Sequence, residues 1–180
     1  METYIALLRG VNVGGRNRVV MADLRARCEA SGLRDVRTYV QSGNLVFVSS
    51  RVAGSLEAQL ERLISGAYDL SVPVLVRTAH VWASYVASNP FPAAAEERPS
   101  LLHLCLSKLP PKKTAVPVLR ERAIGGERIE SHGDALWIDF ASGVGRSKIT
   151  PSALDRLVGS SVTARNWNTV LKIAELAAKA

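Results

Sequence analysis

The sequence predicts an α+β protein built from two ferredoxin-like subdomains of the βαββαβ type, packed together. Over the first half of the chain, apolar strand-like runs alternate with amphipathic helical stretches in the order βαββαβ. The same order begins again after a proline-rich break at 88–99. The 180 residues are 47% hydrophobic and 22% charged, the composition of a chain that buries a core.

The first strand and helix are defined by their apolar residues. Residues 3–9 form an apolar strand. Residues 21–31 form a helix whose Met21, Leu24 and Cys28 share one face, and Gly32 lies just beyond its end.

A hairpin, a second helix and a last strand complete the first unit. Two β-rich runs, 36–41 and 44–48, flank Ser42-Gly43 and predict the hairpin. The apolar residues of the second helix recur at the helical period: Leu56, Leu60, Leu63, Ile64 and Ala67. A strand at 74–77 closes the order through right-handed crossovers, and Thr78 is placed to cap a short helix after it.

The second half starts in the same way. A strand, a helix and two hairpin strands are expected at 101–106, 114–122, 128–130 and 136–140. Thr150 and Pro151 then provide the N-cap and first residue of a helix that Gly159 ends.

The end of the second half departs from the pattern. A final helix starts near Asn166, and its expected buried face consists of Trp167, Val170, Leu171, Ala174 and Ala178. The second subdomain therefore lacks a clear last strand. We divide the chain into a ferredoxin-like subdomain at 1–88, a proline-rich connector at 89–99 and a second α+β subdomain at 100–180.

The charge balance favours anionic partners. The formal net charge is +7 at pH 7, and a basic surface attracts polyanions over long distances. A solvated basic surface without a partner explains the same balance, so both interpretations stay open.

Other features narrow the class of protein. Cys28 and Cys105 are too few for a disulfide framework, and the three histidines are scattered, so no metal or cofactor is expected. No apolar run is long enough to cross a membrane and no leader is recognisable, which predicts a cytoplasmic protein without a membrane partner. The sequence does not constrain the oligomeric state.

Four strings resemble those of a bacterial family catalogued as domain of unknown function 1697. They are YIALLRGVNVGG at 4–15, YVQSGNLVF at 39–47, GRSK at 145–148 and TARNWNTV at 163–170. The resemblance implies a pair of ferredoxin-like α+β subdomains, and it implies no established activity, substrate or cofactor.

The first candidate site is the glycine-rich loop after the first strand. In a βαββαβ unit this loop and the hairpin after the second strand emerge at one end of the sheet. The candidate ligand-binding residues are Arg9, Gly14, Gly15, Arg16 and Arg18 in the loop, with Gln41, Ser42 and Asn44 in the hairpin. Guanidinium groups beside backbone and side-chain donors can hold a phosphate or carboxylate.

The glycine spacing of this loop is neither that of a P-loop nor that of a dinucleotide fingerprint. A structural turn with glycines at positive φ, in which Asn12 ties down the loop, is the competing interpretation.

The second candidate site is the basic loop with Arg146, Ser147 and Lys148. These residues can contact phosphate. A Ser–Lys catalytic pair is disfavoured because adjacent side chains diverge. The competing interpretation is a loop that leads into the following helix.

The third candidate lies at the start of the last helix, with Arg165, Asn166 and Asn168 as ligand contacts. Asn166 or Thr163 can instead serve as an N-cap. Trp167 is expected to be a core anchor rather than a platform for base stacking.

Two further ideas have weaker sequence support. An RNA-recognition sheet needs exposed aromatic residues on its central strands, and only Tyr4 and Phe47 are present. Glu130 and Asp139 lie on the predicted second hairpin and could share a proton, although an exposed edge charge that opposes Arg128 is the commoner arrangement.

Together these observations favour a binding protein for an anionic ligand, either nucleic acid or a nucleotide. One alternative is an enzyme that acts on a small phosphorylated or carboxylated metabolite. The other is a structural or interaction module without an anionic ligand.

Overall fold

The computed structural model describes all 180 residues, which fold into two compact units. The first unit comprises Met1–Ser84 and Lys172–Ala180, and the second comprises Tyr85–Leu171. The C-terminal residues, which the sequence assigned to the second subdomain, thus group with the first. Within the first unit, the Arg37 guanidinium donates to the carbonyls of Leu176 (3.2 Å) and Lys179 (2.7 Å).

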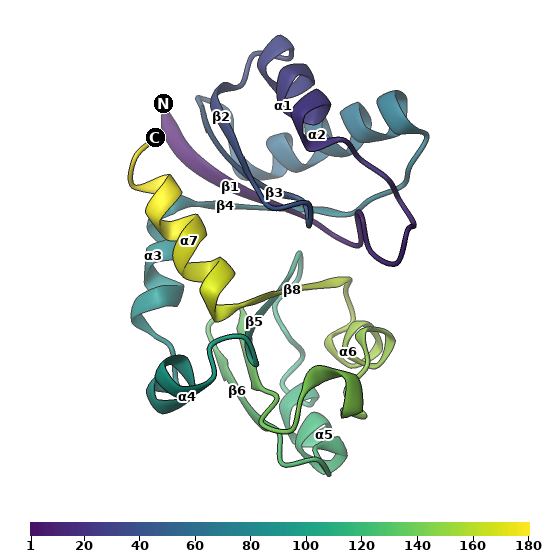
Figure 1. Ribbon diagram of the computed structural model, residues 1–180, viewed down its shortest axis with the longest axis vertical. Helices are drawn as coiled ribbons and strands as arrows, with labels where there is room; N and C mark the ends of the chain where they lie inside the picture. The colour runs from purple at the N-terminus through teal and green to yellow at the C-terminus, as the bar shows by residue number, and fades with distance from the viewer. The chain divides into compact units, whose positions relative to one another are not determined.

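The first unit is a four-stranded antiparallel sheet with two helices on one face (Figure 1). The strands are β1 (Glu2–Leu8), β2 (Arg34–Tyr39), β3 (Asn44–Ser49) and β4 (Val74–Thr78), in the spatial order β2-β3-β1-β4. The helices are α1 (Met21–Ala30) and α2 (Ala53–Tyr68). This is the ferredoxin-like arrangement that the sequence predicts.

The helix-side face of this sheet forms the core of the unit. Tyr4 and Phe47 from the central strands pack there with Leu24 and Cys28 of α1. The predicted apolar stripe of α2 contributes Leu56, Leu60 and Ile64, all fully buried. Deleting one such leucine side chain costs about 2–5 kcal/mol in a well-packed core.

The second unit repeats the same sheet order and contains a last strand that its sequence pattern does not predict. Its strands are β5 (Leu102–Ser107), β6 (Arg128–His132), β7 (Ala135–Asp139) and β8 (Val162–Asn166), in the antiparallel order β6-β7-β5-β8. The expectation of a second unit without a last strand is therefore wrong. β8 is short, contains polar residues and continues directly into a helix, so its apolar pattern is weak.

The helices of the second unit cover one face of its sheet. They are α5 (Ala115–Arg122) and α6 (Pro151–Val158), with a short 3₁₀ turn at Val144–Arg146 before α6. Leu119 of α5 and Leu154 of α6 join Cys105, Ile129 and Ile138 in a common core.

A helix also forms within the proline-rich stretch. It is α4 (Pro92–Glu97), with proline at its start. Arg98, at the C-terminal end of α4, donates a hydrogen bond to the fully buried Asp139 (2.7 Å). Asp139 also accepts a hydrogen bond from Arg128 (2.8 Å). The Arg128 guanidinium lies 4.8 Å from the ring centre of Phe91. Asp139 faces Arg128 across the hairpin, so the suggested Glu130–Asp139 carboxylate pair is wrong.

The two remaining helices confirm their predicted caps. Thr78 accepts the amide of Val81 (3.1 Å) at the start of α3 (Ala79–Ala87). Asn166 accepts the amide of Thr169 (3.0 Å) at the start of α7 (Trp167–Ala177). No helix of the structure combines the length and the apolar character that a membrane span requires.

The buried face of α7 differs from the predicted one. Its buried residues are Trp167, Val170, Ile173 and Ala177, whereas Leu171 is 42% exposed and Ala178 is exposed. The apolar residues of α7 occur as adjacent pairs, so two neighbouring faces have similar hydrophobicity and the spacing cannot choose between them.

Candidate functional site

The glycine-rich loop between β1 and α1 folds as a small hairpin of its own. The amide of Arg16 donates to the carbonyl of Val13 (3.0 Å), and the amide of Asn12 donates to the carbonyl of Asn17 (3.0 Å). Between them, Gly14 and Gly15 have φ of +57° and +76°. Two consecutive positive φ angles define a turn of type I′, which favours Gly-Gly. The structural interpretation therefore accounts for both glycines.

Asn12 holds this loop in place, as the structural interpretation expected. Its side-chain oxygen accepts the amide of Val19 (2.9 Å), and its side-chain nitrogen donates to the carbonyls of Val19 (2.9 Å) and Gln41 (2.7 Å). The loop and the β2–β3 hairpin are therefore neighbours, as the strand directions predict. Asn17, which sequence reasoning missed, donates to the carbonyl of Gly10 (3.0 Å).

The β2–β3 hairpin packs closely against the end of β1 at Gly43. The amide of Leu8 donates to the Gly43 carbonyl (2.8 Å). A Cβ atom at Gly43 would lie 2.6 Å from both Leu8 Cβ and Val11 Cγ2, and its φ is +75°. Only glycine fits this position without displacing its neighbours.

Asn44 maintains the hairpin rather than facing a ligand. The residue is 1% exposed, and its side-chain amide donates to the Tyr39 carbonyl (3.0 Å) and the Ser42 hydroxyl (3.1 Å). Gln41 is exposed at the turn. Of the predicted hairpin residues, Gln41 is thus the most accessible to a ligand.

The loop presents cations and amide donors to solvent. Arg16 and Arg18 are exposed, and neither forms an ion pair. The amides of Gly14 and Gly15, at the centre of the turn, donate to no acceptor within the protein. Arg9 is half-buried and engaged with other groups of the fold. An anion at the turn would meet two guanidinium groups and two backbone donors.

The second basic loop is hydrogen-bonded to a carboxylate from another part of the chain. The Ser147 hydroxyl donates to Glu127, and its oxygen accepts the amide of Ile149 (3.0 Å). Glu127 also accepts the amide of Gly125 (2.9 Å). Burial raises the pKa of Glu127, but the hydrogen bonds from Ser147 and backbone amides outweigh it and the pKa is lowered.

The second loop therefore resembles a helix entry more than an anion site. Thr150 accepts the amide of Ala153 (3.2 Å) as the N-cap of α6. Arg146 and Lys148 are exposed, but the ionised Glu127 beside Ser147 opposes the approach of an anion.

Arg165 is buried rather than displayed. Its guanidinium donates to the Thr163 hydroxyl (2.9 Å) and the Ala164 carbonyl (2.8 Å), and desolvation lowers the pKa of Arg165 to about 10. Asn166 is occupied as the α7 cap. Trp167 is a core anchor as predicted, with its ring centre 5.6 Å from that of Trp137.

The aromatic pair of the first sheet is also internal. The rings of Tyr4 and Phe47 stack at 6.0 Å between centres, and both side chains are buried in the helix-side core. They therefore cannot stack on bases in the manner of an RNA-recognition sheet. Burial likewise raises the pKa of both Cys28 and Cys105 to about 12, so neither thiol is activated.

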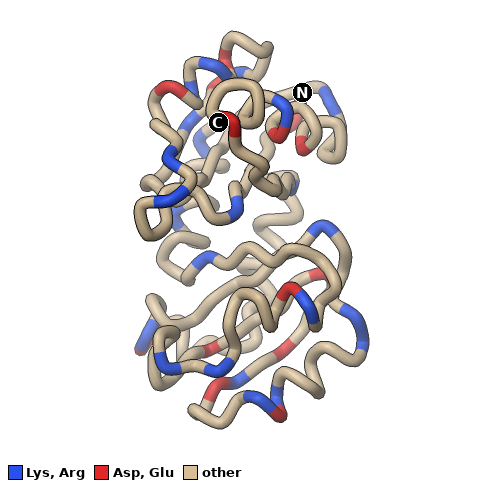
Figure 2. The backbone as a smooth tube through the Cα atoms, turned by 90° about the vertical axis from the view of Figure 1, so that its right-hand side faces the viewer, with Lys and Arg blue, Asp and Glu red and all other residues tan.

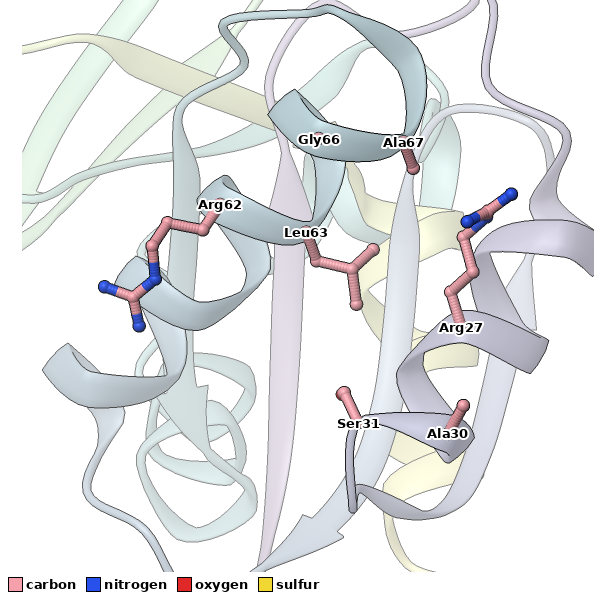
Figure 3. Close-up of a pocket in the computed structure, with 7 residues that line it drawn as sticks. All are labelled: Arg27, Ala30, Ser31, Arg62, Leu63, Gly66 and Ala67. Atoms are coloured by element: carbon pink, nitrogen blue, oxygen red, sulfur yellow. The ribbon is translucent and has the colours of Figure 1, made fainter.

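A groove of about 410 Å³ lies between α1 and α2, away from the predicted residues (Figure 3). It is lined by Arg27, Ala30, Ser31, Arg62, Leu63, Gly66 and Ala67. Arg27 is paired with Asp23 at 2.8 Å, and Asp23 also accepts the Tyr68 hydroxyl (2.8 Å). The charge of Arg27 is therefore balanced within the fold, and the loop at 9–18 remains the stronger candidate for an anion.

Basic residues as such do not single out one site. Figure 2 shows Lys and Arg at many points of both units, interspersed with Asp and Glu. What distinguishes the first loop is the combination of Arg16 and Arg18, which form no ion pair, with turn amides that have no acceptor, on a fixed scaffold.

Comparison with known proteins supports the family and the fold. A family model described as "Protein of unknown function (DUF1697)" matches residues 1–137. The solved structure of a conserved bacterial protein, SP0830 from Streptococcus pneumoniae, aligns with a TM-score of 0.76 and 22% identity over 98% of each chain. No curated protein matches the sequence.

Proposed function

The chain belongs to the family described as protein of unknown function (DUF1697), and for this member we propose a binding function. The loop at 9–18, supported by the hairpin at 41–44, binds the phosphates of nucleic acid in the cytoplasm. The observation that carries the proposal is the turn at Gly14–Gly15, whose amides have no acceptor and which lies beside the unpaired Arg16 and Arg18.

The fixed scaffold supports this function energetically. Asn12 and Asn17 hold the loop through four side-chain hydrogen bonds, to Val19, Gln41 and Gly10. A loop that is ordered before binding loses little conformational entropy when a ligand arrives. The two arginines then supply positive charge, and the N–H groups of the turn orient the bound phosphate through hydrogen bonds.

The chemistry of the loop favours a backbone contact over a base contact. Guanidinium groups and backbone amides recognise phosphate oxygens in any sequence, so the binding should be independent of sequence. The net charge of +7 adds long-range attraction to a polyanion. Such binding releases counterions and weakens steeply as salt rises.

Binding of a labelled oligonucleotide at several salt concentrations tests the proposal. For each phosphate contact the slope of log K against log salt is about −0.9 on duplex DNA and about −0.7 on a single strand. Arg16→Ala with Arg18→Ala should weaken binding and reduce the single-strand slope by about 1.4.

The matched control is Arg62→Ala with Arg122→Ala, which removes the same charge from two exposed helix positions. A similar loss of slope in the control would mean that net charge alone drives binding, and would contradict a site at the loop. Tight binding of mononucleotides without salt dependence would favour a small-molecule ligand instead.

A further inference from the structure

Val40 occupies a backbone conformation that its side chain disfavours. Its φ is +50°, in the left-handed region, where a branched Cβ crowds the backbone. Five non-glycine residues of the protein have positive φ. The other four are Asn12, Asn17, Asp35 and Asp69, the residue types that tolerate this region. Val40 is the exception.

The hairpin does not need a valine at this position. Its turn is fixed by the Asn44 amide, by the contact of Gly43 with Leu8, and by the bond from Asn12 to the Gln41 carbonyl. None of these involves the Val40 side chain, which is 51% exposed. Asparagine would adopt the same φ at lower cost.

The strained valine lies beside the proposed phosphate site. Val40 precedes Gln41, whose carbonyl accepts a hydrogen bond from the side-chain nitrogen of Asn12. Val13 follows Asn12, is 63% exposed, and accepts the amide of Arg16. Val40 and Val13 are thus exposed sequence neighbours of Gln41 and Asn12, the two residues whose hydrogen bond joins the hairpin to the arginine-bearing loop.

We infer that Val40, together with Val13, contacts the apolar face of a sugar or base whose phosphate is held by Arg16 and Arg18. This inference rests on the proposed function and narrows its ligand to single-stranded nucleic acid. In a single strand, bases and sugars are accessible beside the phosphates, whereas a duplex presents mainly its charged backbone. The strain at Val40 is then retained for binding, at the expense of stability.

The test is Val40→Asn, measured by thermal unfolding and by binding to a single-stranded and a duplex oligonucleotide. Relief of strain should raise Tm by about 2–4 °C. Single-strand affinity should fall by about three- to ten-fold through the lost apolar contact, with an unchanged salt slope and less than about two-fold change on the duplex.

The matched control is Val52→Asn, at an exposed valine in the N-cap position of α2 with φ of −78°. Asparagine is a favourable N-cap, so this variant should also gain stability, and its single-strand affinity should equal that of the parent protein.

Each outcome decides a separate point. Unchanged single-strand affinity in Val40→Asn, with the salt slope still dependent on Arg16 and Arg18, overturns this inference and leaves the proposed function intact. An unchanged or lower Tm overturns the premise that Val40 is strained. If the parent protein binds neither oligonucleotide, both the inference and the proposed function fail.

Discussion

The two glycine-rich basic loops look alike in sequence and differ in how they are closed. The loop at 9–18 is tied by the neutral side chains of Asn12 and Asn17. The second loop, at 142–148, is held through the hydrogen bond of Ser147 to the carboxylate of Glu127. Hydrogen bonds from neutral asparagine side chains leave the positive charge of the neighbouring arginines unbalanced. A carboxylate in the same role offsets part of the positive charge of the residues around it. We therefore expect the residue that fixes a basic loop to decide whether an anion binds there.

The largest effect is expected where the first loop meets the sheet. Gly43→Ala places a Cβ 2.6 Å from Leu8 and Val11 at a φ of +75°. Overpacking and backbone strain together should cost about 2–4 kcal/mol of unfolding free energy, measured by chemical denaturation.

Gly15→Ala is the matched control, because its φ is similar at +76° but no atom lies within 4 Å of the added methyl group. It should cost about 1 kcal/mol. Equal losses in the two variants would mean that close contact does not fix the hairpin.

A smaller loss of unfolding free energy is expected when Asn12, which holds the first loop in place, is replaced. Asn12→Ala removes three hydrogen bonds and should cost about 2 kcal/mol of unfolding free energy. Oligonucleotide affinity should fall while the salt slope persists, because the arginines remain but their scaffold loosens. Asn17→Ala, which removes one side-chain hydrogen bond, should show about half the loss of stability. A flattened salt slope in Asn12→Ala would contradict this division of roles.

The smallest effect on stability is expected from Glu127, which holds the second loop. Glu127 has a lowered pKa in the folded state, so its ionised form stabilises the fold above the unfolded pKa of about 4.3. That stability is lost as the pH falls through the folded pKa. Glu127→Gln should therefore lose less stability on acidification than the parent protein.

The same Glu127→Gln variant also tests the role of the second loop at neutral pH. Without the carboxylate, Arg146 and Lys148 should contribute to oligonucleotide binding and steepen the salt slope by up to about 0.7 per additional phosphate contact on a single strand. An unchanged slope would mean that loop geometry, rather than Glu127, excludes the anion.

Sequence patterns predicted the fold well wherever apolar residues recur with one clear period. The stripe of α2 and the caps at Thr78, Thr150 and Asn166 all form as expected. The sequence pattern does not predict β8, because its five partly polar residues carry little periodic signal and α7 begins immediately after them. Leu171 was misplaced because adjacent apolar pairs make two helix faces equivalent.

The candidate site was predictable only in part. Strand direction was enough to bring Gln41 beside the first loop, and Asn12 was expected to tie the loop down. The pairing of Ser147 with Glu127 joins residues 20 apart in sequence, and no local pattern signals it. The burial of Arg165 and Asn44 depends on packing around their strands, which composition does not reveal.

The most direct test compares the two loops in one assay. Salt slopes for single-stranded oligonucleotide binding would be measured for Arg16→Ala with Arg18→Ala and for Arg146→Ala with Lys148→Ala, which remove equal charge. A smaller slope in the first variant alone is the predicted result. Equal slopes in the two variants, or a loss confined to the second, would contradict a phosphate site at the first loop.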